Sequence, residues 1–413
     1  MLFTVGVLLV GTLSALWAYR RAARGVPFTR MMAQAPDELV TAVTRLAGNG
    51  QRNRMLATLK LGSVEAGFPR LEWWDYTDFG LIAEFTVLGG QSTKTWTDAE
   101  TLDAMAHYLG VPKVTVTSPG PSRICLEMRA FDVLATAAKV PQVVADDVDL
   151  EAVPTGIFED GSTWCVPIQG SHVLLAGRTG SGKSGVLWSL INGMGPAIRS
   201  GRVDLRVIDP KAMELSFLEP LCTQFQCTEP EDMVALLEGT VRDMREATHR
   251  YRGKVRKPVP TPENPLTVVI IDEAATLSAF SDPELRRRFE RAHGMLLSQG
   301  RAPLFSIIET VIDPSKDTVP QRQLFPYRIG LGMDESGQVD MIHGRGARER
   351  GSHCDEIPTT TQGVCYVQED GKAGFRRARA FHVQDADVDR IVAEYAPLPR
   401  PINLADFGED TAA

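Results

Sequence analysis

A loop of eight residues, GRTGSGKS from Gly177 to Ser184, has the composition and spacing of a phosphate-binding loop. It fits the pattern G-x-x-x-x-G-K-[ST], because the last three residues are Gly182, Lys183 and Ser184. Glycines allow successive backbone N–H groups to point at phosphate oxygens. Lys183 would reach the β/γ-phosphates, and the Ser184 hydroxyl would bind Mg²⁺. The candidate cofactor-binding residues are Gly177, Arg178, Thr179, Gly180, Ser181, Gly182, Lys183 and Ser184.

A pair of acids farther along the chain could complete a hydrolytic site. TVVII, from Thr267 to Ile271, has the β-branched apolar character of a buried parallel strand, and Asp272 and Glu273 follow directly. An acid at this place would hold Mg²⁺, and a second acid would orient and deprotonate the attacking water. We therefore assign Asp272 to the metal together with Ser184, and Glu273 to the role of general base.

The elements around these residues predict an α/β fold. The apolar run HVLLA precedes the loop, and the periodic segment 184–192 follows it as a helix. Segments 203–211, 302–310 and 323–333 are further strands, and 231–253 is a helix. Alternating strands and helices favour a mostly parallel, doubly wound sheet.

The N-terminal residues predict a membrane anchor. Leu2 to Tyr19 carries no charge, and Arg20, Arg21 and Arg24 follow at once. This length approaches the roughly 30 Å of the hydrocarbon core. The position of the arginines places the bulk of the chain in the cytoplasm, so we expect a single-pass protein of the cell membrane. The alternative is a buried helix of a soluble domain.

Residues 31–150 predict a small α+β accessory domain. The segment 37–47 is an amphipathic helix, and two strands flank the turn SPGP in 113–131. Trp73, Trp74 and Tyr76 would either stack on bases or pack in a core. The predicted organisation is 1–30 for the anchor and its basic flank, 31–150 for the accessory domain, 151–396 for the P-loop domain and 397–413 for an acidic tail.

The overall charge does not indicate a nucleic-acid-binding protein. The formal net charge is −8, but local patches decide such binding. The later half of the 231–253 helix and the residues after it are basic. This run is either a solvated face or a binding surface; its members are Arg242, Arg245, Arg250, Arg252, Lys254, Arg256 and Lys257.

Three segments resemble the FtsK/SpoIIIE family of hexameric DNA translocases: VLLAGRTGSGKS, VIDPKAMELSFLEP and TVVIIDEAATL. A later stretch, QVDMIHGRGARERGSHCDEIPTTTQGVCYVQEDG, is similar to the actinomycete branch, which includes plasmid, phage and integrative-element versions. The resemblance covers roughly 153–395. It implies a RecA-like ring ATPase that uses ATP and Mg²⁺ to pump double-stranded DNA.

The resemblance also implies roles for residues outside the two motifs. Asp209, Lys211 and Glu214 match the family's Asp-Pro-Lys…Glu segment, near the nucleotide or a subunit boundary. Arg301, in SQGRAP, and Arg328, in YRIGLG, each match an arginine that could act in trans on the γ-phosphate. With these two, the candidate catalytic residues are Lys183, Asp272, Glu273, Arg301 and Arg328.

Two departures from the family pattern leave alternatives open. The strand after the G-R-A motif reads IIETVIDPSKD, where many members carry Ala-Thr-Gln-Arg-Pro. The glutamine and arginine that could sense phosphate are therefore missing, and Glu309 and Thr310 occupy roughly that place. The winged-helix module expected after the motor does not follow before the acidic tail. A ring ATPase for protein export is one alternative, although such proteins usually carry several motor domains. An ATP-binding regulatory membrane protein that anchors a partner is the second.

Overall fold

The computed structural model describes residues 28–143, 148–213, 215–348, 350–372 and 374–398. It divides into two compact units, Met1–Val133 and Leu134–Ala413, which are described separately. The predicted anchor at 2–19 and residues 399–413 of the acidic tail lie outside the described residues. Within the described residues, no helix is long and apolar enough to cross a membrane.

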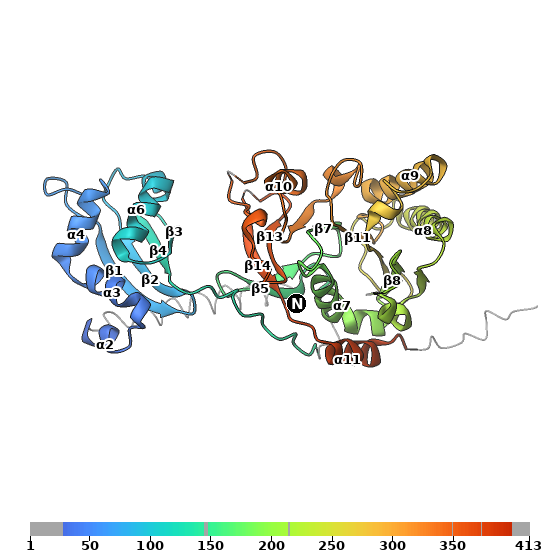
Figure 1. Ribbon diagram of the computed structural model, residues 1–413, viewed down its shortest axis with the longest axis horizontal. Helices are drawn as coiled ribbons and strands as arrows, with labels where there is room; N and C mark the ends of the chain where they lie inside the picture. The colour runs from blue at the N-terminus through green and yellow to red at the C-terminus, as the bar shows by residue number, and fades with distance from the viewer. Residues whose placement is uncertain (1–27, 144–147, 214, 349, 373, 399–413) are drawn as a thin grey trace, which may run out of the picture. The chain divides into compact units, whose positions relative to one another are not determined.

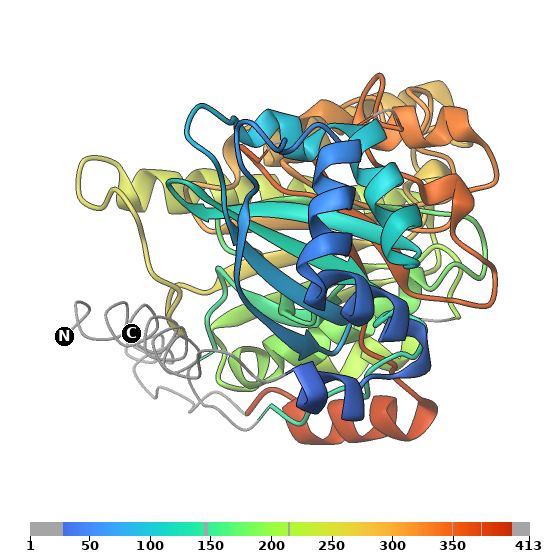
Figure 2. The same ribbon diagram turned by 90° about the vertical axis from the view of Figure 1, so that its left-hand side faces the viewer.

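The first unit is a four-stranded antiparallel sheet with helices on one face (Figure 2). The strand order is β1-β2-β4-β3. The bounds of the strands are β1 Arg70–Thr77, β2 Gly80–Thr86, β3 Lys113–Gly120 and β4 Arg123–Arg129. The bounds of the helices are α2 Phe28–Ala33, α3 Val40–Ala47, α4 Asn49–Thr58, α5 Thr93–Thr97 and α6 Ala99–Leu109.

The three aromatic residues of β1 divide between the two faces of this sheet. Trp74 and Tyr76 pack against the buried core under the helices, and the Tyr76 hydroxyl donates to the Met31 carbonyl at 2.7 Å. Trp73 faces the other way and donates its indole N–H to Glu84 at 3.0 Å. The core interpretation therefore holds for two of the three, and no shared stacking platform forms.

The second unit contains a ten-stranded sheet of order β6-β5-β14-β13-β12-β7-β11-β10-β8-β9. The run from β12 to β9 is parallel, and the strands from β13 to β6 are antiparallel. This confirms the predicted α/β class with a large, mostly parallel sheet. The strand bounds are β5 Val153–Phe158, β6 Thr163–Val166, β7 Val173–Ala176, β8 Val203–Ile208, β9 Gln224–Gln226, β10 Leu266–Ile271, β11 Phe305–Val311, β12 Tyr327–Gly330, β13 Val364–Gln368 and β14 Arg376–Ala380.

Helices cover both faces of this sheet because its central strands are apolar on both sides (Figure 1). Leu175 and Val268 face one core with α7 and α11, whereas Leu174 and Val269 face the other with α8, α9 and α10. The helix bounds are α7 Lys183–Arg199, α8 Pro230–Tyr251, α9 Pro283–Gln299, α10 Ser336–His343 and α11 Asp385–Tyr395.

The segment before β5 packs with the second unit. The sequence predicts the domain boundary after residue 150, whereas the contacts place it between Val133 and Leu134. Leu134 and Leu150 are buried in the two cores of the second unit, and the Tyr395 hydroxyl donates to the Val143 carbonyl at 3.0 Å. Burial of these apolar side chains, which the linker-like composition conceals, fixes the boundary.

Candidate functional site

The phosphate-binding loop leaves the carboxyl end of β7 and leads directly into α7. Gly182 has φ 100°, which L side chains rarely adopt, and a Cβ there would lie 2.4 Å from the backbone nitrogen of Gly363. Gly363 donates its N–H to the Ser181 carbonyl at 2.9 Å. The turn before β13 therefore holds the loop and requires glycine at residue 182.

The loop borders a cavity of about 330 Å³. Thr179, Gly180, Gly182, Lys183 and Ser184 line it together with Asp272, so residues far apart in the sequence meet there. Parallel strands explain this meeting, because the carboxyl ends of β7 and β10 lie at the same edge of the sheet. The cavity is also lined by Ala137, Gly185, Lys211, Ile312, Gln362, Gly363, Ala380, Phe381, His382 and Val383, none of which except Lys211 is a sequence-predicted site residue.

Three of the predicted loop residues anchor the loop and do not line the cavity. Arg178 donates its backbone N–H to the Gly332 carbonyl at 2.8 Å, and its guanidinium donates to the carbonyls of Met333 and Ile357, each at 2.8 Å. A Cβ on Gly177 would lie 2.7 Å from the Ser181 hydroxyl. These contacts fix the start of the loop against the segment after β12.

Lys183 lies folded back over its own loop. Its ammonium donates to the Gly177 carbonyl at 2.6 Å and to the Arg178 carbonyl at 3.2 Å. It is half-buried and lines the cavity. These bonds hold the ammonium beside the space where an anion would bind.

Asp272 and Glu273 are buried directly after β10, with only 6% and 8% of their surface exposed. Thr310, on the neighbouring strand β11, donates its hydroxyl to Asp272 at 2.6 Å and accepts the N–H of Glu273 at 3.3 Å. Glu273 has φ 53°, a strained conformation for a residue with a side chain. The hydroxyl of Thr310 thus holds the backbone turn that aims both carboxylates.

Lys211 bridges the two acids. Its ammonium lies 3.4 Å from Asp272 and 3.5 Å from Glu273. Burial alone would lower the pKa of Lys211, but the two carboxylates outweigh it and raise the pKa. Its neighbour Asp209 is fully buried, and burial together with the Asp272 charge raises the pKa of that carboxyl. The Asp-Pro-Lys segment therefore reaches the acids, while Glu214 lies outside the described residues.

Glu309, next to Thr310 on β11, points to the opposite face of the sheet. Its carboxylate lies 2.6 Å from the imidazole of His293 on α9, and each side chain is 1% exposed. The other imidazole nitrogen lies 3.1 Å from the side-chain oxygen of Gln321. The sequence marks Glu309 as unusual for the family, but it does not single out His293, because periodicity marks a helical histidine only as a core position.

Arg301 and Arg328 line a different hollow, of about 440 Å³, at the amino edge of the parallel strands. Arg301 precedes β11 and is half exposed, with Asp370 at 4.0 Å. Arg328 is largely buried, which lowers its pKa, and donates to the carbonyls of Phe325 and Ile342 at 3.0 Å and 3.2 Å. Neither arginine lines the cavity of its own chain at the carboxyl edge.

Comparisons with known proteins find similarity to one family over part of the chain. Residues 147–257 match the FtsK/SpoIIIE family model. The chain is 24% identical over 349 residues to the DNA translocase FtsK of Staphylococcus epidermidis, covering 79% of this chain and 42% of that protein. It is 28% identical over 243 residues to the protein Tra of Streptomyces lividans, covering 52% of this chain and 37% of that protein.

A solved structure shows a similar fold. EssC (ATPases 2 and 3) from Geobacillus thermodenitrificans aligns with a TM-score of 0.50 and 15% identity, covering 66% of this chain and 56% of that one. At that identity the likeness concerns the fold alone. The chain spans about two-fifths of the length of the curated relatives named above.

Proposed function

We propose that this chain, a P-loop ATPase of the FtsK/SpoIIIE family, hydrolyses ATP to move double-stranded DNA of a plasmid, phage or integrated element. One observation carries the proposal: the cavity at the carboxyl edge brings Lys183 and Ser184, at the start of α7, together with Asp272, which follows β10. The family match and the likeness to Tra support DNA as the substrate.

The residues at the cavity fit a Mg²⁺ ion. One carboxylate oxygen of Asp272 is buried and makes no hydrogen bond, with the Lys211 ammonium 3.4 Å away, and Ser184 lines the same cavity. Carboxylate and hydroxyl oxygens are the ligands that Mg²⁺ prefers. We assign both residues to the metal, which when bound with ATP would neutralise charge on the phosphates.

The other side chains of the site have separate roles in binding ATP and activating water. Lys183 exchanges its carbonyl partners for phosphate oxygens, and the N–H groups of the loop and of the start of α7 bind the same anion. Glu273 accepts the proton of the attacking water. Lys211 places a positive charge beside both carboxylates, 3.4 Å from Asp272 and 3.5 Å from Glu273.

We assign the arginine that acts in trans to Arg301. Its guanidinium is half exposed and makes one long contact, whereas Arg328 is held by two carbonyls and serves the local fold. An arginine offered by a neighbouring chain requires an assembly. We propose that the assembly is a hexameric ring, as the resemblance to the translocase family implies. We also propose that residues 2–19 anchor the ring in the cell membrane, with the bulk of the chain in the cytoplasm.

ATP hydrolysis by the full chain, with and without linear double-stranded DNA at low and moderate salt, tests the proposal. We expect DNA to stimulate turnover and salt to weaken the stimulation, because DNA contacts are mainly to phosphate. Turnover that ignores DNA would overturn the DNA motor in favour of protein export. An absence of turnover with intact ATP binding would favour a regulator.

A further inference from the structure

Helices α8 and α9 lie side by side and run in the same direction. The Glu238 carboxylate accepts two bonds from the Arg288 guanidinium, at 3.0 Å and 2.8 Å, and Arg245 contacts the Met295 sulfur at 3.7 Å. Each pair joins residues 50 positions apart, which is the constant register of two parallel helices. This register places arginines of both helices along one shared line.

A hollow of about 300 Å³ opens along that line, and we call it the α8–α9 groove. Four guanidinium groups and one carboxylate line it. The lining residues are Glu238, Val241, Arg242, Arg245, Arg288, Arg291, Ala292 and Met295.

The positive charge of the α8–α9 groove is not balanced by the described part of the chain. Glu238 pairs with Arg288, whereas Arg242, Arg245 and Arg291 are exposed and have no carboxylate within ion-pair distance among the described residues. Asp243, next to Arg242 in the sequence, pairs instead with Arg206 at 2.7 Å. Like charges gathered in this way repel one another unless an anion joins them. The gathering stands out in a chain whose net charge is −8.

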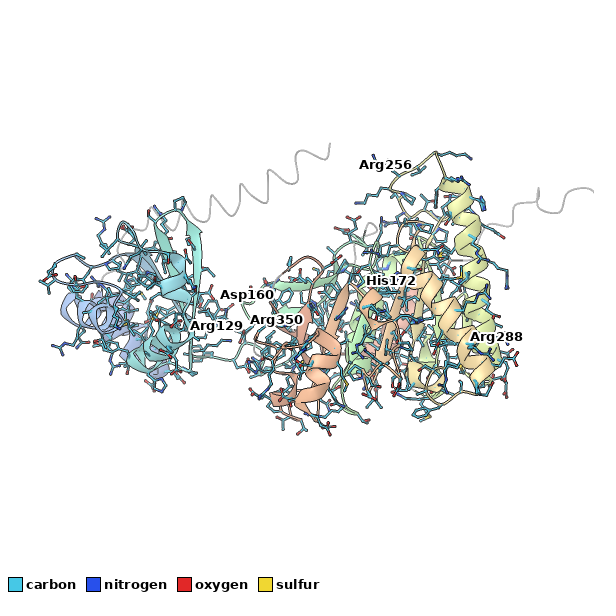
Figure 3. The ribbon with its side chains drawn as sticks, turned by 90° about the horizontal axis from the view of Figure 1, so that it is seen from above. Arg129, Asp160, His172, Arg256, Arg288 and Arg350 are labelled. Carbon is cyan, nitrogen blue, oxygen red and sulfur yellow. The ribbon has the colours of Figure 1, made fainter. Side chains whose placement is uncertain are left out.

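The basic surface continues beyond the hollow. Arg250, near the end of α8, and Arg252, Lys254 and Arg256 after it are exposed. Figure 3 shows Arg288 near one end of the helix pair and Arg256 past the other. From Arg242 to the end of α8 the axis runs about 14 Å, at 1.5 Å per residue. A single small anion fills one point of such a surface, whereas a polymer with a regular row of phosphates follows its length.

We propose that the α8–α9 groove binds the phosphate backbone of double-stranded DNA, through Arg242, Arg245 and Arg291. Guanidinium groups suit this ligand because their planar fork matches two phosphate oxygens. The inference rests on the proposed function, to which it adds the surface that DNA contacts. This surface belongs to the outer layer of helices, away from the residues that line the nucleotide cavity.

The test measures the affinity of the full chain for a fluorescent 30-base-pair duplex over a series of salt concentrations. The variant R242Q/R291Q removes two groove charges from exposed positions, so the fold is retained. The matched control is Arg287→Gln, an exposed arginine of α9 that does not line the groove and donates to the Pro283 carbonyl. ATP hydrolysis without DNA verifies that each variant is intact.

We expect R242Q/R291Q to bind DNA more weakly whatever its sequence, and the slope of log K against log salt to fall by about 2, or about 1 for each lost phosphate contact. Arg287→Gln should keep the wild-type slope. A double variant with wild-type affinity and slope would overturn the groove and leave the DNA motor standing. A wild-type chain that fails to bind the duplex at low salt would overturn the proposed function itself, and the groove with it.

Discussion

Charged residues are held differently at the two ends of the parallel strands of the large sheet, which we call the carboxyl edge and the amino edge. At the carboxyl edge, Asp209 and Asp272 are buried, and each has an oxygen without a hydrogen-bond partner. The backbone there is strained at Glu273 and left-handed at Gly182. At the amino edge, the Arg328 guanidinium has its carbonyl partners, and Arg301 is half exposed. The first edge is organised for a ligand, and the second offers a cation.

Under the proposed assignment of Arg301, this difference means that one chain holds two halves of a hydrolytic site that cannot meet. β11 alone, from Phe305 to Val311, separates the edges by roughly 20 Å, at about 3.3 Å per residue. Arg301 stands before this strand, and the acids lie beside its far end. The proposed role of Arg301 therefore implies a site completed by the amino edge of one chain against the carboxyl edge of another.

Removing the cation of the carboxyl edge should have the largest effect. Lys183→Ala deletes the charge that faces the β/γ-phosphates, so we expect ATP binding to be lost. Titration with a fluorescent ATP analogue measures this. Lys257→Ala, on an exposed lysine paired with Glu151, is the control and should bind normally. Unchanged affinity of Lys183→Ala would show that the cavity is not the nucleotide site.

Removing the cation of the amino edge should spare binding and lower turnover. Arg301→Ala is expected to reduce kcat by about 10³-fold, the lower range for an arginine supplied in trans. Steady-state ATP hydrolysis measures kcat. Arg328→Gln is the comparison: because its carbonyl bonds hold the fold, it should lower thermal stability instead. An Arg301→Ala protein with normal kcat would break the assignment of the two edges.

Glu273→Gln tests the carboxyl edge by removing its general base. ATP affinity should persist, while turnover should fall by about 10²-fold or more, the range for general-base catalysis. Single-turnover hydrolysis measures this. Mixing this variant with Arg301→Ala sharpens the comparison, because a mixed ring contains some sites with both intact residues. Recovered activity is expected; mixtures as inactive as the separate variants would contradict a shared site.

The sequence predicts the residues whose chemistry depends on local spacing. Lys183 and Ser184, and likewise Asp272 and Glu273, are recognisable because a few neighbouring residues define their roles. Gly363 could not be predicted in the same way, since it meets Gly182 only after β13 takes its place in the sheet. Its contact depends on strand order, which local spacing does not encode.

The sequence also does not show which face of a sheet a side chain takes, or which loop residues bond to a distant segment. The sequence leaves Trp73, Trp74 and Tyr76 between base stacking and core packing, and only the pairing of β1 with β2 decides which face each side chain takes. Arg178 was predicted among the phosphate ligands. Its backbone N–H instead donates to the Gly332 carbonyl, and its guanidinium donates to the carbonyls of Met333 and Ile357. In both cases, contacts distant in sequence decide the outcome.

Thr310→Val should disturb the carboxyl edge less than loss of an acid. The variant removes the hydroxyl that donates to Asp272 and accepts from Glu273 at nearly unchanged volume. A lost bond to a buried charged group costs about 1–3 kcal/mol, so the unfolding free energy and kcat should both fall. Chemical denaturation and hydrolysis measure them. Thr361→Val, on an exposed threonine, is the control, and equal effects of the two would remove Thr310 from this role.

The buried pair between the two edges should give the smallest effect, visible in its pH dependence. Burial alone would lower the pKa of His293, but the Glu309 carboxylate outweighs it and raises the pKa. The folded state therefore binds a proton more tightly than the unfolded state. This stabilisation is full below about pH 6.5, the unfolded value, and is lost as pH rises through the raised folded pKa.

Amide hydrogen exchange in α9 and β11, corrected for the intrinsic rate at each pH, measures the loss. The local opening free energy should decrease above about pH 6.5 in the wild type. In H293Q/E309Q this decrease should flatten, because neither partner of the pair is charged. His249→Gln, at an exposed position of α8, should keep the wild-type profile. If H293Q/E309Q also kept it, the buried pair would not tie α9 to the strand that carries Thr310, and the two edges would be joined by apolar packing alone.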